Sequence, residues 1–384
     1  MAKPCPSSRP CPPLAPAAAF ALLTLLGGRL ASAEPLPRFS GNPVWNQNIS
    51  AAAVHPNSAS MISTLAGLGG FGFGRMQIDF GFHLVHAAPG APTRTIVSHP
   101  EGYFSPDCEP LGTVMPVPAN AAIEGQAGLT CDNLAEDCHL LVLQGRTLYE
   151  AYRTTAPNGS QLQAECLAIW HLDLTYPETG RGDHCTSADA AGFPIAPLLW
   201  NADEIAASLA IDSTGGGDLG HAIRFILPNP RMANDPSLGG VGGRLYVRPG
   251  THAGGPSGPV GTIPYGARLR LRADFPLTNY PPAAKVVLNT MKRYGIVLSD
   301  GGSVALTAES DLYTTTKWVD LGIDSRVFDL TPGATDPTVN DFAVLDTGPR
   351  IAETWDCVPN NLAPPVFANG FEAGNTSAWS QTLP

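Results

Sequence analysis

ARLRLRA, residues 267–273, has the most regular alternation of apolar and charged side chains in the chain. Successive side chains of a β-strand point to opposite faces, so a period of two predicts a strand with buried leucines and solvent-facing arginines. Residues 75–85 (RMQIDFGFHLV) follow the same rule, with five apolar residues on one face. The two segments predict a fold built mainly from β-strands.

Further short extended segments continue this pattern. Residues 139–152 predict a hairpin, in which Gly145 takes the positive φ that a tight two-residue turn requires. Residues 296–306, with Asp-Gly-Gly at their centre, predict a second hairpin. Strands are also expected in residues 166–174 and 221–227.

One helix is predicted between Pro281 and Gly295. Its apolar residues have the spacing of a buried helical stripe, and they are Ala284, Val287, Leu288 and Met291. Proline suits the first turn, and glycine suits the left-handed stop. A weaker helix pattern covers residues 201–210. The expected fold class is mostly β: a β-sandwich or jelly-roll-like body with one or two short amphipathic helices.

Composition narrows the class of protein. Among 384 residues there are 41 Gly and 38 Pro, and only 14% are charged, which argues against a coiled coil or helical array. The 43% of hydrophobic residues argues against disorder. The net charge of −11 argues against electrostatic binding of nucleic acid, so no nucleic-acid partner is expected.

The N-terminus has the features of a signal peptide. Residues 1–33 combine a basic start, an apolar stretch and a small-residue cleavage site at Ala31-Ser32-Ala33. No other stretch is long and apolar enough to predict a membrane span. We therefore expect a secreted protein, extracellular or periplasmic. Three parts follow the signal peptide: a flexible lead-in (34–70), a single β-rich domain (71–357) and a C-terminal tail (358–384).

Six cysteines follow the predicted cleavage site, and an even number favours disulfides in an oxidising compartment. The preferred pairs are Cys131 with Cys138, Cys166 with Cys185, and Cys108 with Cys357. The alternative is a zinc site that uses His139 and His184, but the chain has no C-x2-C knuckle. We expect no metal and no cofactor.

An ordered series of motifs resembles a group of exported microbial β-rich proteins whose function is not established. The motifs are SADAAG-F-P-I (187–195), HAIRF (221–225), YGARLRL (265–271) and KRYG…SDGGS (292–303). The resemblance covers about residues 116–311 and implies a shared fold without a catalytic assignment. Residues 367–380 (FANGFEAGNTSAWS) resemble a short tail that ends many exported bacterial proteins, which implies a role in export or surface handling.

The candidate catalytic residues are carboxylates and histidines of the predicted strands and turns: Glu124, Asp173, Asp189, His221, His252 and Asp300. Buried carboxylates of raised pKa would suit glycoside cleavage. Each also has a structural explanation. Asp189 would cap a short helix, Asp300 would be a turn residue, and His221 would belong to the core or its rim.

The candidate substrate-binding residues are Arg224, Tyr246, Arg248, Arg268 and Arg270. If Leu269 and Leu271 are buried, Arg268, Arg270 and Arg272 share one face and would form a basic strip for an acidic polymer. The alternatives are neutralisation by neighbouring acids and protection of an edge strand.

Two classes of function fit these residues, and the sequence leaves open whether the protein is an enzyme. The first is a carbohydrate-active enzyme, hydrolase or lyase, acting on an extracellular polysaccharide, which would be acidic if the arginine strip binds it. The second is a non-catalytic protein that binds a glycan or surface polymer through Trp170, Trp200, Tyr246 and Trp318. A structural surface protein with no small ligand is a third alternative.

Overall fold

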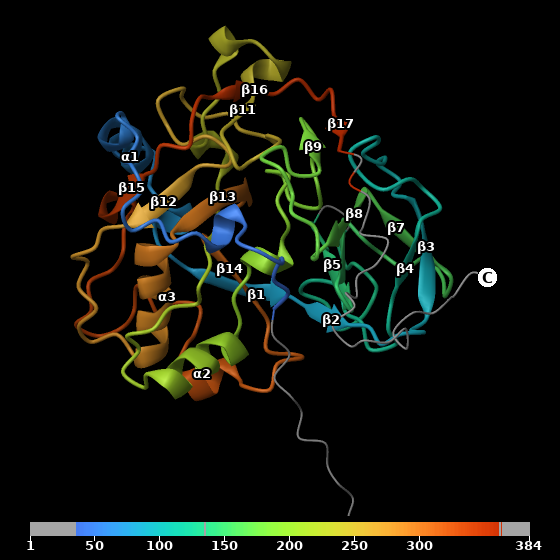
Figure 1. Ribbon diagram of the computed structural model, residues 1–384, viewed down its shortest axis with the longest axis horizontal. Coiled ribbons are helices and arrows are strands. Elements are labelled where there is room, and N and C mark those ends of the chain that lie inside the picture. Colours follow the sequence, from blue (N-terminus) through green and yellow to red (C-terminus); the bar gives the residue numbers. More distant parts are fainter. Residues whose placement is uncertain (1–35, 134–135, 361, 363–384) are drawn as a thin grey trace, which may run out of the picture. The chain divides into compact units, whose positions relative to one another are not determined.

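The computed structural model describes residues 36–133, 136–360 and 362. The predicted signal peptide and nearly all of the C-terminal tail lie outside the described residues. Within them the chain is mostly β, as expected, with several sheets and three short α-helices (Figure 1).

The largest sheet has six strands in the order β1-β14-β10-β13-β12-β15. Their bounds are Ile78–Phe82, Leu306–Glu309, Ile223–Leu227, Ile296–Gly301, Arg268–Leu271 and Phe342–Val344. The pairs β1/β14 and β10/β13 are parallel, and the other neighbours are antiparallel. Parallel neighbours bring the carboxyl ends of β10 and β13 to the same edge of the sheet.

A four-stranded sheet continues directly from the first. Only His83 separates β1 from β2 (Leu84–His86), which pairs with the next sheet in the order β2-β5-β6-β8. Its other strands are β5 (Leu140–Gln144), β6 (Thr147–Tyr152) and β8 (Cys166–His171). The extended segment 75–85 therefore contributes to two sheets.

The remaining strands form smaller sheets. A three-stranded sheet contains β4 (Val114–Pro116), β3 (Thr93–Ser98) and β7 (Gln161–Ala164). Two pairs complete the set: β11 (Leu245–Tyr246) with β16 (Ile351–Ala352), and β9 (Gly182–Asp183) with β17 (Val358–Pro359).

The helices pack against the six-stranded sheet and each other. Helix α3 (Pro282–Arg293) contacts β12 and α2 (Ala202–Ile211), and α1 (Ser58–Gly67) contacts β15. All four residues of the predicted stripe in α3 are buried, and Asn201 caps α2 by accepting from the amide of Glu204 at 2.9 Å. The 3₁₀-helices are η1 Val44–Asn46, η2 Gly72–Gly74, η3 Ala196–Leu198, η4 Asn229–Arg231, η5 Pro236–Leu238, η6 Val241–Gly243, η7 Trp318–Leu321 and η8 Val339–Asp341.

One predicted hairpin is confirmed and the other is wrong. β5 and β6 pair antiparallel around Gly145, whose φ is +59°. β13 and β14 do not pair with each other, because β10 lies between them in the sheet. The turn pattern at Asp300 is local, whereas the strand inserted between β13 and β14 comes from more than 60 residues earlier in the chain.

The segment predicted to be a flexible lead-in is well packed where the structure describes it. It contains η1 and α1, and it buries Leu36, Phe39 and Ile49. The Arg268 guanidinium donates to the carbonyl oxygens of Val44 at 2.7 Å and Gln47 at 3.2 Å. Arginines of β12 therefore hold this segment against the sheet.

Three disulfides join all six cysteines that follow the predicted signal peptide, as expected. The local pair Cys131–Cys138 is confirmed. The other two predicted pairs are wrong, because the bonds are Cys108–Cys166 and Cys185–Cys357. The loop before Cys108 runs beside the start of β8, where the amide of Phe104 donates to the carbonyl oxygen of Glu165 at 2.8 Å.

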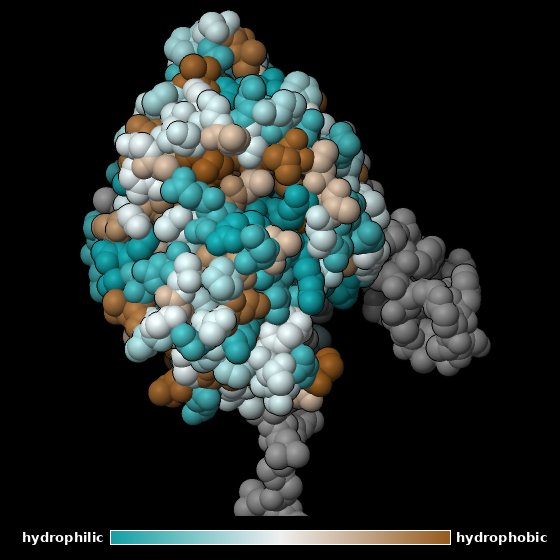
Figure 2. Space-filling model, turned by 90° about the vertical axis from the view of Figure 1, so that its left-hand side faces the viewer, coloured by the Kyte–Doolittle hydropathy of each residue, from teal (hydrophilic) through white to brown (hydrophobic). Residues whose placement is uncertain are grey.

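Among the described residues, no helix is long and apolar enough to cross a membrane. On the face that carries α1, hydrophobic residues form small separate groups between polar ones (Figure 2). That face therefore presents no single large apolar patch.

We predict that Arg268 stabilises the fold far more than Arg272, although both come from the same alternating segment. Replacing Arg268 with Met removes the guanidinium donors of the Gln47 and Tyr294 carbonyl oxygens and one of two donors to that of Val44, which should lower the free energy of unfolding by about 2–4 kcal/mol. Arg272 is 41% exposed and pairs with Asp274 and Asp341, so Arg272→Met should leave the free energy of unfolding nearly unchanged. Urea unfolding of both variants measures the difference, and equal losses would contradict this role of Arg268.

Candidate functional site

A pocket of about 1020 Å³ lies at the carboxyl ends of β10 and β13. Residues 228–230 after β10 and 301–303 after β13 line it, together with residues 186–190. Ligands commonly bind beyond the carboxyl ends of parallel strands, where loops and backbone amides converge. We call this the main pocket.

The SADAAG motif forms a tight loop, residues 186–192, at the wall of the main pocket. Ser187 Oγ accepts from the amide of Asp189 at 3.0 Å, and Asp189 Oδ1 accepts from the amide of Ala191 at 3.1 Å. Gly192 has φ +76°, and a Cβ atom there would come within 2.0 Å of Thr251 Oγ1. Asp189 therefore stabilises a turn. The prediction that it caps a short helix is wrong, because residues 186–192 form turns and no helix.

Arg224 lies in the middle of the six-stranded sheet and is 2% exposed. Its Nη2 donates to Asp189 Oδ2 at 2.8 Å, and its Nη1 donates to Thr307 Oγ1 at 3.0 Å. The guanidinium also lies over the Phe82 ring, 5.1 Å from its centroid. A buried charge needs such partners, so Arg224 fixes the 186–192 loop against β10 and β14.

A β-bulge in β13 brings Asp300 to the same face of the sheet as Arg224. Phe225 pairs with Leu298, but the next residue, Ile226, pairs with Asp300, so Ser299 is the additional residue. In a regular ladder without the bulge, Ile226 would pair with Ser299, and Asp300 would pair with Leu227 and point to the opposite face. With it, Asp300 Oδ2 lies 3.9 Å from the Nη2 of Arg224 that also binds Asp189.

Asp189 and Asp300 form a closely interacting pair of carboxyl groups. Asp189 is fully buried, and Asp300 keeps 20% exposure at the pocket. Burial and the neighbouring Asp189 raise the pKa of Asp300 to about 7, and Arg224 opposes this rise. Burial also raises the pKa of Asp189. Asp300 can therefore hold a proton near neutral pH and release it into the pocket.

Two more carboxylates and a histidine line the main pocket. Asp137 is exposed, and its charge contributes to the raised pKa of Asp300, while Asp107 accepts from the amide of Thr186 at 2.8 Å. His252 Nδ1 lies 2.8 Å from the carbonyl oxygen of Ala190, whose own amide donates to Asp300 Oδ2 at 3.3 Å. The backbone of Ala190 thus connects His252 to Asp300.

Glu124 lies behind this group, outside the main pocket. Its Oε2 is 2.7 Å from His139 Nδ1, and His139 Nε2 is 2.9 Å from the carbonyl oxygen of Ala188. Burial alone would lower the pKa of His139, but the Glu124 carboxylate raises it to about 9. Through His139 this ion pair contacts the 186–192 loop at the carbonyl oxygen of Ala188. The charge of Glu124 also raises the pKa of Arg224.

Two other candidate catalytic residues lie away from the main pocket. Asp173 is 31% exposed and accepts from Arg146 Nε at 2.8 Å. His221 is buried beside Arg38, with 2.6 Å between its Nε2 and Arg38 Nη2. Burial and this neighbouring cation lower the pKa of His221. The structure therefore brings Asp189, His252 and Asp300 together, with Glu124 behind them, but not Asp173 or His221.

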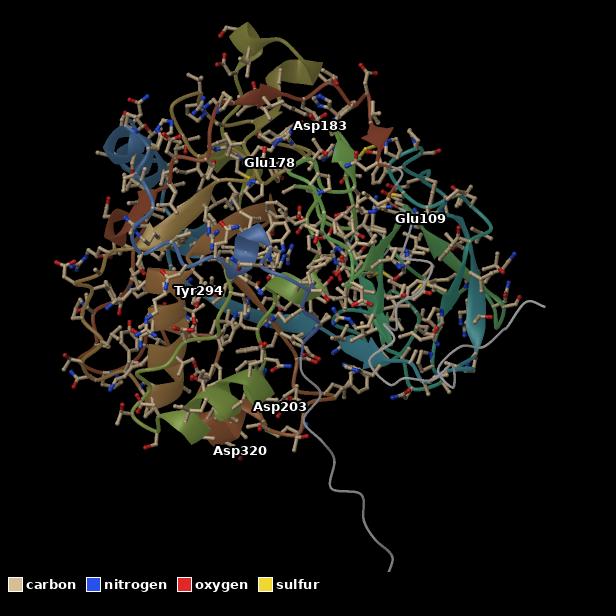
Figure 3. All side chains as sticks on the ribbon, in the orientation of Figure 1. Glu109, Glu178, Asp183, Asp203, Tyr294 and Asp320 are labelled. Carbon is tan, nitrogen blue, oxygen red and sulfur yellow. A yellow bond between two sulfur atoms is a disulfide. The ribbon has the colours of Figure 1, made fainter. Side chains whose placement is uncertain are left out.

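The candidate substrate-binding residues are mostly engaged in other contacts. Tyr246 is buried and donates to Asp183, which also accepts two bonds from Arg248 at 2.8 and 3.0 Å. Asp183 lies on β9, beside the segment that ends in β17 (Figure 3). Arg268 is 3% exposed, and the Arg270 guanidinium donates to carbonyls of residues 49–52. Arg268 and Arg270 therefore do not form the basic strip that was predicted to bind an acidic polymer.

The aromatic residues that could contact a ligand differ from those singled out in the sequence. Trp170, Trp200 and Trp318 are at most 6% exposed, because each packs in the core. The main pocket is instead lined by Phe104, 43% exposed, and Trp355, 48% exposed. Phe104 follows Tyr103 and Trp355 follows Thr354, each in a mainly polar stretch of the sequence. A large aromatic residue in a polar stretch is the sequence feature that could have indicated them.

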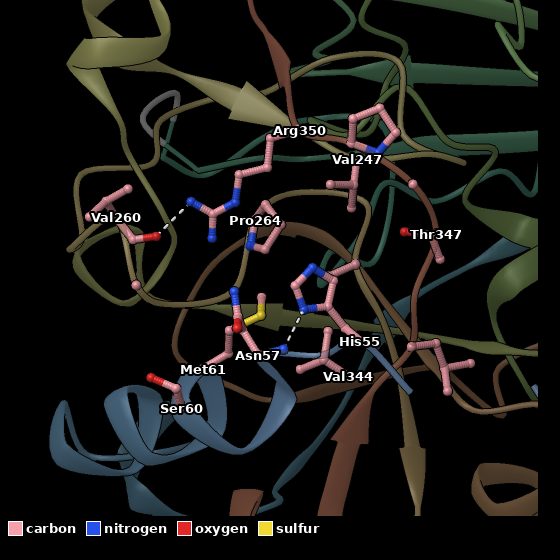
Figure 4. A pocket seen from close by; sticks show the side chains of 15 residues that line it. His55, Asn57, Ser60, Met61, Val247, Val260, Pro264, Val344, Thr347 and Arg350 are labelled. Carbon is pink, nitrogen blue, oxygen red and sulfur yellow. Dashed lines mark hydrogen bonds between the residues drawn. The ribbon is translucent and has the colours of Figure 1, made fainter. Parts of the chain in front are cut away.

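A second pocket, about 450 Å³, differs in chemistry (Figure 4). Arg350 and His55 line it beside Met61 and Val344, but it has no carboxylate. Arg350 Nη1 donates to the carbonyl oxygen of Val260 at 2.6 Å, and His55 Nδ1 accepts from the amide of Asn57 at 3.1 Å. The main pocket is the better candidate for acid–base chemistry.

No cluster of three or more metal-ligating side chains occurs among residues 36–133, 136–360 and 362.

Comparisons of the chain with protein-family models, curated proteins and solved structures gave no match. The chemistry of the pocket itself therefore carries the argument about function.

Several buried acids predict that the stability of the fold decreases from mildly acidic to mildly alkaline pH. Burial raises the pKa of Glu150 and Asp300 to about 7 and that of Glu309 to about 8. Each binds its proton more tightly in the folded state, so stability is greatest below the unfolded pKa and falls as pH rises through the folded pKa. Tm should fall by roughly 5 °C or more between pH 5 and pH 8.5.

The neutral variant Glu309→Gln tests the cause of this loss. Glu309 is 4% exposed and accepts from Asn201 Nδ2 at 2.8 Å, so the amide should remove part of the fall in Tm between pH 5 and 8.5. Glu101→Gln, at a side chain 62% exposed, is the control and should leave the fall unchanged. A Tm that rises toward pH 8.5 would contradict the prediction.

Proposed function

We propose that this protein is an exported hydrolase that cleaves glycosidic bonds of an extracellular polysaccharide, with Asp300 as the proton donor. The observation that carries the proposal is a carboxyl group of pKa about 7 at the wall of a pocket of about 1020 Å³. General acids in glycoside cleavage need such a raised pKa to hold a proton near neutral pH.

The roles of the neighbouring residues follow from their positions. Asp300 donates its proton to the glycosidic oxygen as the bond to the anomeric carbon breaks. Asp137 takes a proton from the water molecule that attacks that carbon, and the products are an alcohol and a sugar with a reducing end. Asp137 then releases its proton to solvent and Asp300 takes one up, which restores the starting state. Asp189 and Arg224 are positioning residues, because both are buried and their charges act in opposite directions on the pKa of Asp300.

The charges of the pocket favour a hydrolase over a lyase. Lyases of acidic polysaccharides must neutralise a substrate carboxylate, and that requires an accessible cation. Arg224 is 2% exposed and already bound to Asp189. Arg244 also lines the pocket, but its guanidinium donates to the carbonyl oxygen of Gly254 and lies over the Trp355 ring. Asp107 and Asp137 place negative charge in the pocket. An uncharged polysaccharide is therefore the preferred substrate, and the basic strip that suggested an acidic one is not available.

Export is the part of the proposal that rests on the sequence. The three disulfides are of the kind that oxidising compartments favour, and they support this compartment. The signal-like residues 1–33, the tail and the resemblance to exported microbial proteins are the further reasons for proposing it.

The second candidate is a non-catalytic glycan-binding protein. The observation that favours it is the pair of exposed aromatic side chains, Phe104 and Trp355, because they would bind a sugar without any acid–base chemistry. The two candidates differ in whether Asp300 matters, since a binding protein does not need a proton donor.

Asp300→Asn should lower kcat by about 100-fold or more, because the amide cannot donate the proton. The test is a panel of plant, algal and microbial polysaccharides, with reducing ends and unsaturated products measured separately. In the wild type, the rate should fall as pH rises through about 7, where Asp300 loses its proton. Asp173→Asn, at an exposed carboxylate away from the pocket, is the control and should retain full activity.

Other outcomes decide against the hydrolase. Unsaturated products would indicate a lyase, and binding without any product would indicate the glycan-binding protein. Full activity of Asp300→Asn would remove Asp300 from the mechanism, and neither binding nor product on any polysaccharide would favour a structural protein.

A further inference from the structure

Trp355 has an unusual combination of exposure and backbone conformation. It is 48% exposed, lines the main pocket and has φ +61°. Left-handed backbone is unfavourable for a bulky side chain and persists only where the surrounding structure imposes it. Residues 353–357, which we call the strap, connect β16 to β17 and contain this tryptophan.

Glu353 imposes the conformation of the strap. Its side chain is fully buried, and it accepts from the amides of Ala253 at 2.9 Å and Trp355 at 2.8 Å. The same oxygen that binds the Trp355 amide lies 3.3 Å from His184 Nδ1. His184 also has a positive φ, +58°, so one carboxylate holds two residues in this strained conformation.

The strap is also bound to the segment that leads into the 186–192 loop. Cys357, its last residue, forms a disulfide with Cys185, which immediately precedes the 186–192 loop. The amide of Glu353 donates to the carbonyl oxygen of Arg244 at 2.9 Å, which fixes the other end. Trp355 is therefore held at a constant position relative to Asp189 and its neighbour Asp300.

The surroundings of the indole ring leave it suited to a ligand. The Arg244 guanidinium lies over the ring, 4.6 Å from its centroid, and also donates to the carbonyl oxygen of Gly254. Packing one face in this way orients the ring without burying it. Phe104, stacked on Tyr152 with ring centroids 6.4 Å apart, adds a second exposed aromatic face in the same pocket.

We infer that Trp355 is a sugar-binding platform, which the strap holds in place so that a pyranose ring stacks on the indole beside Asp300. This inference rests on the proposed function for its ligand class and adds the residue that binds the substrate. An exposed, rigid aromatic face matches the apolar C–H face of an uncharged sugar ring, and it loses little conformational entropy on binding. The cost of holding Trp355 in the left-handed region is then explained by ligand binding.

The test measures binding apart from catalysis. The parent is the Asp300→Asn protein, so that hydrolysis does not consume the probe. Trp355→Ala and Trp355→Phe are each made in this parent. Their migration is compared in native gels that contain laminarin, xylan, hydroxyethylcellulose or alginate. The Asp300→Asn protein should be retarded by at least one uncharged polysaccharide. Trp355→Ala should weaken that affinity about tenfold or more, and Trp355→Phe should weaken it less.

A matched control separates stacking from general effects of exposed aromatics. Phe73 is 59% exposed, has φ +51° and does not line the main pocket, so Phe73→Ala should migrate as its parent does. Thermal unfolding by circular dichroism identifies a variant that fails to fold. If Trp355→Ala fails to fold, the folded Trp355→Phe variant decides the question by its weaker retardation.

Binding and catalysis can fail independently. Equal retardation of the folded Trp355 variants and their parent would overturn the inference, and so would the absence of retardation in every gel. Full activity of Asp300→Asn would overturn the proposed function while leaving a Trp355-dependent retardation intact. Retardation by alginate alone would overturn the assignment of an uncharged sugar.

Discussion

The buried ion pair between Arg224 and Asp189 is the interaction on which the rest of the site depends. Arg224 is 2% exposed and Asp189 is fully buried, so neither charge is solvated by water and each requires the other. Arg224 belongs to a central strand, whereas Asp189 belongs to an irregular loop. Pairing them fixes the loop to the sheet, and it places a second carboxyl group, Asp300, in surroundings where losing a proton is unfavourable.

The same physical device recurs elsewhere in the fold. Arg268 and Arg270 use their guanidinium groups to bind backbone carbonyls of residues 44–52, and Glu353 uses its carboxylate to bind two amides. A chain with 41 Gly and 38 Pro has many segments without regular hydrogen bonding. Buried charged side chains supply the missing partners for those backbone groups, because an unpaired buried carbonyl or amide is costly.

Binding and proton transfer come from different parts of the chain in this pocket. Asp300 is placed by a bulge in β13, while Trp355 is placed by the strap and its disulfide. The Cys185–Cys357 bond and the contacts of Glu353 with Ala253 and His184 bring the strap to the segment that precedes Asp189. A rigid arrangement of this kind suits an enzyme that must hold a sugar ring at a fixed distance from a proton donor.

Local patterns in the sequence determined the strands, the helix α3 and the hairpin around Gly145, because period, caps and turn residues act over a few positions. They also marked Asp189, His252 and Asp300 as polar residues in conspicuous loops. Only the tertiary structure decided that Asp300 shares a face with Arg224, since this depends on one additional residue, Ser299, in the pairing of β13 with a distant strand. The tertiary structure likewise decided that Arg268 is buried and that Trp355 is exposed. Alternation says which side chains share a face of a strand, but what covers that face comes from segments far away in the chain.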